Sequence, residues 1–107
     1  MNIATGTLNK LQGLERLYRQ GFHSEIIDRT IDKLLDMESH RARKEQRELE
    51  AHLAAYESQY QISSKEFYRR FRAGELGDEM DFVEWSIFYE LHRVILERIE
   101  VLGTSTQ

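Results

Sequence analysis

The sequence predicts an all-α protein, and three observations support this prediction. None of the 107 residues is proline, the residue that breaks helices most strongly. The strong helix formers Leu, Glu, Arg, Ala and Gln dominate, and β-branched residues never form the alternating run typical of a strand. We therefore expect four helices: a short one, an over-long central one, a second short one, and a C-terminal helix that packs back on the central helix as in a helical bundle or coiled coil.

The first helix is expected over residues 7–20, where apolar residues recur at steps of three and four and share one face. Gly21 follows at the position where a left-handed residue ends a helix. Residues 1–6 are expected to be frayed. The six glycines are expected to lie at the ends of elements, where they separate one helix from the next.

The central helix is expected over residues 24–62, with Ser24 as its N-cap, because neither glycine nor proline interrupts this stretch. At about 1.5 Å per residue such a helix is about 58 Å long, whereas a compact chain of this length has a radius of gyration of about 13 Å. The helix must therefore either project and be covered by a partner or break in its polar stretch, residues 39–48. In the absence of a helix breaker we favour projection.

Ser63 and Glu66 form a capping-box pattern, and Ile62 and Phe67 stand at the positions of a hydrophobic staple. A short helix is therefore expected over residues 63–73, with Gly74 after its end. Asp78 or Asp81 is then expected to cap the last helix. If Asp81 is the cap, Met80 and Trp85 would form a second staple.

The last helix is expected to reach residue 102, before a polar tail over residues 103–107. Six of its residues fall on alternating steps of three and four and should face the second half of the central helix. They are Trp85, Phe88, His92, Ile95, Ile99 and Leu102.

Length and composition limit the class of protein. A chain of 107 residues predicts one domain, residues 1–107. The absence of cysteine excludes disulfides and thiolate chemistry, and a net charge of −4 argues against nucleic-acid binding. Residues 1–20 lack the apolar stretch of a signal peptide, and no run is long enough to span a membrane. We expect a cytoplasmic protein without a cofactor.

An acidic segment precedes and opens the last helix, and it contains no Lys or Arg. Asp78, Asp81 and Glu84 stand three residues apart, a spacing that could hold a hard divalent cation. Capping of the helix, or docking of a basic partner, explains the same acids better. The residues of this acidic docking surface are Glu75, Asp78, Glu79, Asp81 and Glu84.

Arg47 and His52 have the R-x4-H spacing found in small all-helical HEPN ribonucleases. A chain with this many arginines and histidines produces about one such match by chance. No histidine pair has the three- or four-residue spacing of a helical metal site, so we expect no metal. A HEPN-like ribonuclease is therefore the alternative function.

Two stretches carry a resemblance to a known group of proteins. One is Tyr-Arg-Gln-Gly-Phe-His-Ser-Glu-Ile-Ile at residues 18–27, followed by Asp-Lys-Leu-Leu at residues 32–35. The other covers residues 67–85, and its most specific part is G-x-x-G-D-x-x-D-F-x-E-W at residues 74–85. Together they resemble small, helical, largely uncharacterised prokaryotic proteins, some of which look like the antitoxin halves of toxin–antitoxin modules. The resemblance implies a role in binding and neutralising a partner protein, and it brings no catalytic motif.

The leading hypothesis is thus a non-enzymatic protein–protein interaction module, an antitoxin-like inhibitor. Its partner is expected to be a protein such as a toxin, a second copy of the chain in a homodimer, or both. A structural coiled-coil adaptor is a further alternative. The residues expected to form the interface are Ile27, Ile31, Leu34 and Leu35.

Overall fold

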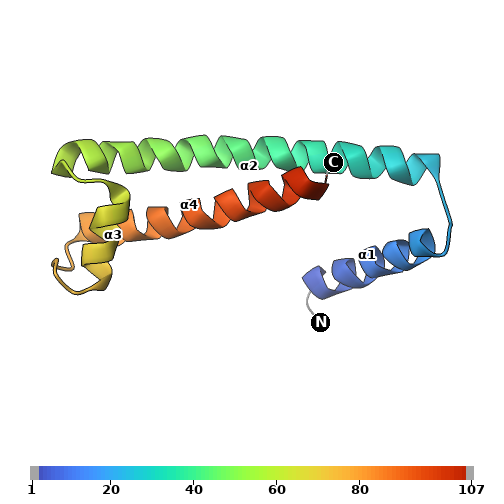
Figure 1. Ribbon diagram of the computed structural model, residues 1–107, viewed down its shortest axis with the longest axis horizontal. Helices are drawn as coiled ribbons and strands as arrows, with labels where there is room; N and C mark the ends of the chain where they lie inside the picture. Colours follow the sequence, from blue (N-terminus) through green and yellow to red (C-terminus); the bar gives the residue numbers. More distant parts are fainter. Residues whose placement is uncertain (1–2, 106–107) are drawn as a thin grey trace. The chain divides into compact units, whose positions relative to one another are not determined.

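The computed structural model describes residues 3–105 and confirms the all-α class (Figure 1). This part of the chain contains four helices: α1 (Ile3–Arg19), α2 (Glu25–Tyr60), α3 (Ser64–Arg72) and α4 (Met80–Ser105). It divides into two compact units, an N-terminal unit that ends at Leu34 and a C-terminal unit that begins at Leu35. Each is described by itself below. The single-domain organisation expected from the chain length stays a prediction.

The outer helices are longer than expected. Helix α1 begins at Ile3, so residues 3–6 are helical rather than frayed, and α4 continues through residues 103–105 of the expected polar tail. Residues 1, 2, 106 and 107 lie outside the part that the structure describes. Gly6, Gly13 and Gly103 lie inside helices, so the prediction that glycines only separate elements was wrong. Glycine in a helix costs only about 1 kcal/mol relative to alanine, which surrounding helix formers can offset.

Helix α2 is continuous over 36 residues, about 54 Å at 1.5 Å per residue. The alternative of a break within residues 39–48 was therefore wrong. An ion pair of 2.9 Å joins Arg41 of this polar stretch to Glu38 just before it, and Ala42 within the stretch is buried. The helix ends two residues earlier than expected, because Gln61 adopts a left-handed conformation with φ of 55°.

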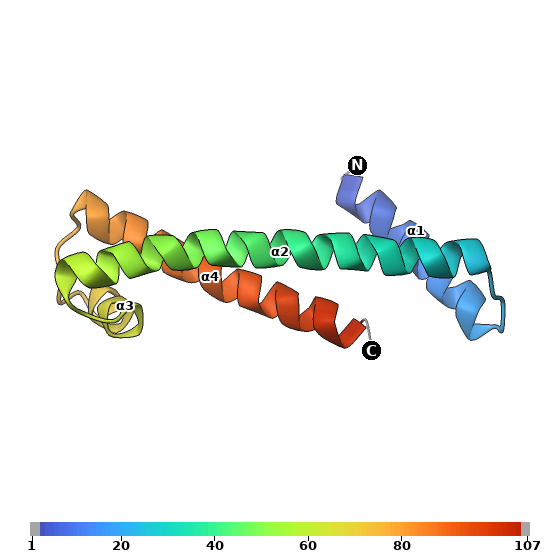
Figure 2. The ribbon, with the colours of Figure 1, turned by 90° about the horizontal axis from the view of Figure 1, so that it is seen from above.

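In the C-terminal unit, α4 runs back along α2, as predicted (Figures 1 and 2). One apolar cluster joins Ala42 and Leu49 of α2 to Ile95 of α4. All six residues of the predicted seam are buried or half-buried. The seam therefore fixes which face of α4 contacts α2.

A second cluster, mostly aromatic, closes the other end of this unit. Phe67 of α3 stacks on Trp85 of α4 with ring centroids 3.8 Å apart, and both side chains are fully buried. The Trp85 indole N–H donates to Ser64 Oγ at 2.9 Å, so its polar atom is also satisfied. Helix α3 is thereby held against α4.

The ends of α3 match the prediction closely. Ser63 is the N-cap, and its hydroxyl accepts from the Glu66 backbone N–H at 3.1 Å. Gly74 follows the last turn with φ of 75°, and its N–H donates to the Phe71 carbonyl. Ile62 packs in the same cluster as Phe67, as the staple requires.

The start of α4 differs from the prediction. The helix begins at Met80, so Glu79 flanks it, and neither Asp78 nor Asp81 is the N-cap. Met80 is 71% exposed while Trp85 is fully buried, so the second staple does not form either. Capping preferences are local, whereas Asp81 makes a hydrogen bond with a distant tyrosine, described below.

Candidate partner-binding groove

The N-terminal unit is a helical hairpin built on a sharp turn between α1 and α2. Gly21 has φ of 95°, and the N–H groups of Gly21 and Phe22 donate to the carbonyls of Tyr18 and Leu17 at 3.1 and 3.0 Å. These two bonds form a Schellman motif, as the glycine position predicted. Ser24 then caps α2, because its hydroxyl accepts from the Ile27 N–H at 3.4 Å.

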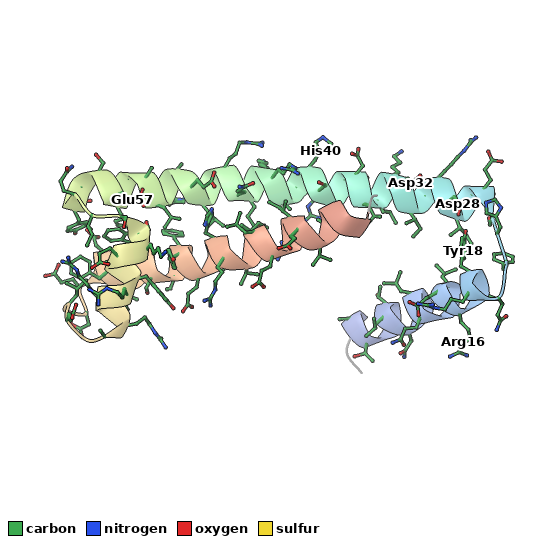
Figure 3. All side chains as sticks on the ribbon, viewed as in Figure 1. Arg16, Tyr18, Asp28, Asp32, His40 and Glu57 are labelled. Carbon is green, nitrogen blue, oxygen red and sulfur yellow. The ribbon has the colours of Figure 1, made fainter. Side chains whose placement is uncertain are left out.

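Tyr18 ties the two helices of the hairpin together. Its hydroxyl donates to Asp28 Oδ1 at 2.7 Å and lies 3.2 Å from the Ser24 carbonyl oxygen. The other Asp28 oxygen lies 2.7 Å from His23 Nε2. Burial and the hydrogen bond to Asp28 raise the pKa of Tyr18, so the hydroxyl remains a donor at neutral pH. Figure 3 shows Tyr18 and Asp28 pointing toward one another while Arg16 points away.

A groove of about 480 Å³ lies between these helices. Five of its eight lining side chains are apolar or aromatic, and the other three are carboxylates. The lining residues are Leu11, Leu14, Glu15 and Tyr18 of α1, and Ile27, Asp28, Ile31 and Asp32 of α2.

The hairpin by itself leaves its apolar side chains largely exposed. Within residues 4–34 no residue is buried, whereas residues 35–103 include seven buried residues. Ile26 is 78% exposed. Even the five least exposed residues that line the groove are only half-buried, namely Leu14, Tyr18, Ile27, Asp28 and Ile31. The large apolar residues exposed in this unit are Leu8, Leu11, Leu17, Phe22, Ile26 and Leu34. Exposed apolar surface of this extent is typical of interaction sites.

The structure brings part of the predicted interface into the groove. Ile27 and Ile31 line it and are half-buried. Leu34 is 50% exposed and Leu35 is half-buried, and neither lines the groove. The role of these four residues as an interface stays a prediction.

Two acids of the predicted docking surface are engaged inside the C-terminal unit. Asp81 accepts from the Tyr60 hydroxyl at 2.6 Å, and Glu84 accepts from the Tyr56 hydroxyl at 2.8 Å. Burial and the Glu84 bond raise the pKa of Tyr56 to about 12, and the Asp81 bond, followed by burial, raises that of Tyr60 to about 12. These carboxylates therefore join α4 to α2.

The other three acids of that surface are more accessible. Glu75 lies 3.7 Å from Arg69 in an exposed ion pair, and such pairs contribute little to stability. The side chains of Asp78 and Glu79 are exposed. Docking of a basic partner on this surface stays a prediction, with fewer free carboxylates than the sequence suggested.

The residues of the ribonuclease alternative lie on the same helix without contacting each other. Arg47 and His52 are both exposed, and within residues 3–105 no hydrogen bond or ion pair joins them. The His52 ring stacks on Phe88 with centroids 4.3 Å apart, so one of its faces packs against α4. His92 of the seam lies 3.0 Å from Glu50, and this hydrogen bond lowers the pKa of the Glu50 carboxyl.

In the part of the chain that the structure describes, no group of three or more His, Asp or Glu side chains could hold a metal ion. None of the described helices is both long and apolar enough to cross a membrane. Comparisons with protein-family models, curated proteins and solved structures find no match to this chain. The resemblance to antitoxins therefore stays a prediction.

Sequence reasoning identified both walls of the groove separately but missed the groove itself. The apolar face of the first helix includes Leu11, Leu14 and Tyr18, and the interface prediction includes Ile27 and Ile31. The available signal was the short connection expected between two apolar helices, residues 21–23, since short connections place successive helices side by side.

Proposed function

We propose that the protein is a non-enzymatic interaction module whose N-terminal hairpin binds a partner protein, in the manner of an antitoxin-like inhibitor. The observation that carries this proposal is the absence of any buried residue within residues 4–34, a stretch rich in leucine and isoleucine. A half-exposed leucine that becomes buried against a partner contributes about 1 kcal/mol, so several of them supply a substantial binding energy.

A bound partner would also stabilise the hairpin, because few contacts within the hairpin hold its helices together. Helix α1 has 17 residues and contains Gly6 and Gly13, each of which costs up to about 1 kcal/mol in a helix interior. In proteins most of the stability of a helix comes from packing of its apolar face. A partner seated on the groove would therefore stabilise α1 as well as cover its apolar face.

Affinity capture from the native cell, with Ile31→Glu as the test variant, examines this proposal. The substitution places a charge in the groove and should remove the captured partner. Arg29→Glu is the matched control, because Arg29 is exposed on the same helix, forms an ion pair with Glu25 and does not line the groove. Circular dichroism must show equal helix content for both variants. Retention of the partner by the Ile31→Glu variant would refute the proposal.

The inhibitor role has a further readout. A captured partner that arrests growth when expressed alone should be neutralised by co-expression of the wild-type chain and not by co-expression of the Ile31→Glu variant. A partner whose expression has no effect on growth would instead favour the adaptor function over the antitoxin-like one.

A further inference from the structure

The charge of the groove indicates the chemistry of its occupant. All three of its charged lining residues are acidic, and none of the eight is Lys, Arg or His. Asp28 is already held by Tyr18 and His23, and Glu15 lies 3.5 Å from Arg19 in an exposed pair. Among residues 3–105 the Asp32 carboxylate makes no ion pair or side-chain hydrogen bond. Its negative charge is thus available to a ligand.

The spacing of the apolar side chains indicates a helical occupant. Leu11, Leu14 and Tyr18 follow one another along α1 over about 10.5 Å, which is two helical turns. Ile27 and Ile31 continue the same apolar surface on α2. A helix laid between two others contributes side chains at positions i, i+3 or i+4, and i+7, and these match an apolar surface of two turns.

We infer that the groove binds a cationic amphipathic helix of a partner protein, with its apolar face on the five apolar side chains and a Lys or Arg paired with Asp32. This inference rests on the proposed function and specifies its partner. A second copy of the hairpin is a poorer occupant. A two-fold association of the groove with itself places Glu15, Asp28 and Asp32 of one copy near the same carboxylates of the other, and like charges at an interface are unfavourable.

Two synthetic 18-residue peptides test the inference with the full-length protein. Both carry leucine on the same helical face, and they differ only in having lysine or glutamate at every polar position. Fluorescence anisotropy of the labelled peptides gives their affinities. The lysine peptide should bind at least about ten times more tightly than the glutamate peptide, and its affinity should fall as salt rises.

Substitutions then separate the charge from the apolar contact. Asp32→Asn should lower the affinity for the lysine peptide by about three- to tenfold, because one partly exposed ion pair is lost. Asp36→Asn is the matched control, since Asp36 is exposed on α2, lies outside the groove, and should leave the affinity unchanged. Ile31→Glu should reduce binding of both peptides to the background level.

Equal affinity for both peptides, or no effect of Asp32→Asn, would overturn the inference. Failure of both peptides to bind would also overturn it, and the native partner's sensitivity to Ile31→Glu would then show whether the proposed function survives. Sedimentation equilibrium tests whether a second copy of the chain occupies the groove instead. A wild-type dimer that Ile31→Glu converts to a monomer, and that the lysine peptide does not dissociate, would assign the groove to a second copy and overturn the inference.

Discussion

Removal of the Ser64 hydroxyl should destabilise the C-terminal unit by about 2 kcal/mol. Ser64 is 4% exposed and Trp85 is fully buried, and the indole N–H has the Ser64 Oγ as its acceptor at 2.9 Å. Ser64→Ala leaves that donor buried without a partner, which costs about 1–3 kcal/mol. The higher helix propensity of alanine offsets about 0.5 kcal/mol at most. For a unit of this size the net loss corresponds to a fall in Tm of roughly 8–16 °C.

Trp85 is the only tryptophan of the chain, so its fluorescence during thermal or urea unfolding reports on this unit alone. Ser58→Ala is the matched control, because Ser58 is exposed on α2 and its substitution should change the free energy of unfolding by less than about 0.5 kcal/mol.

A double-mutant cycle with Trp85→Phe isolates the hydrogen bond, since phenylalanine has no N–H to leave unpaired. Followed by circular dichroism, Ser64→Ala should cost much less in the Trp85→Phe background than in the wild type. An equal cost in both backgrounds, or an unchanged midpoint for Ser64→Ala alone, would refute the reasoning.

Three further predictions follow from the structure. Gly13→Ala should stabilise α1 by up to about 1 kcal/mol, because alanine has the higher helix propensity and nothing lies within 4 Å of the added methyl group. Hydrogen exchange measures this as increased protection of the α1 amides, and lower protection would contradict it. Since the pKa of Tyr56 and that of Tyr60 are raised from 10.0 to about 12, their contribution to stability should be complete below pH 10 and lost as pH rises to 12. Absorbance at 295 nm, compared between the wild type and the Tyr56→Phe and Tyr60→Phe variants, measures this, and ionisation of either side chain near pH 10 would exclude it. Hydrogen bonds from two arginines of α3 lower the pKa of Glu66 from 4.5 to about 2. The contribution of Glu66 to the free energy of unfolding should therefore be present above pH 4.5 and lost as pH falls to 2. NMR titration of the carboxyl group measures this pKa, and ionisation near pH 4.5 would contradict the prediction.

The predictions from sequence succeeded where the determining interactions are local. Ser63 and Gly74 fix the ends of α3 through bonds to residues within five positions of them, and the sequence displays those residues together. The seam of α4 was also predictable, because its heptad-like spacing directly reflects the face that contacts α2.

The failures concern interactions between residues far apart in the chain. Asp81 and Glu84 were interpreted as caps or as free docking acids, but they accept hydrogen bonds from tyrosines 21 and 28 residues earlier. The end of α2 at Tyr60 was missed because it depends on a left-handed Gln61, a conformation for which glycine is the usual signal. The groove required knowledge of how two helical faces meet, which periodicity within either helix does not contain.

The unequal burial of the two units has a consequence for how such a chain can diverge. Substitutions at exposed positions usually change the free energy of unfolding by less than about 0.5 kcal/mol, whereas substitutions in an aromatic core such as that of Phe67 and Trp85 cost several. Residues 4–34 can therefore accumulate changes one at a time while the fold of the C-terminal unit persists. Homologues should accordingly keep their aromatic core and differ most in the hairpin.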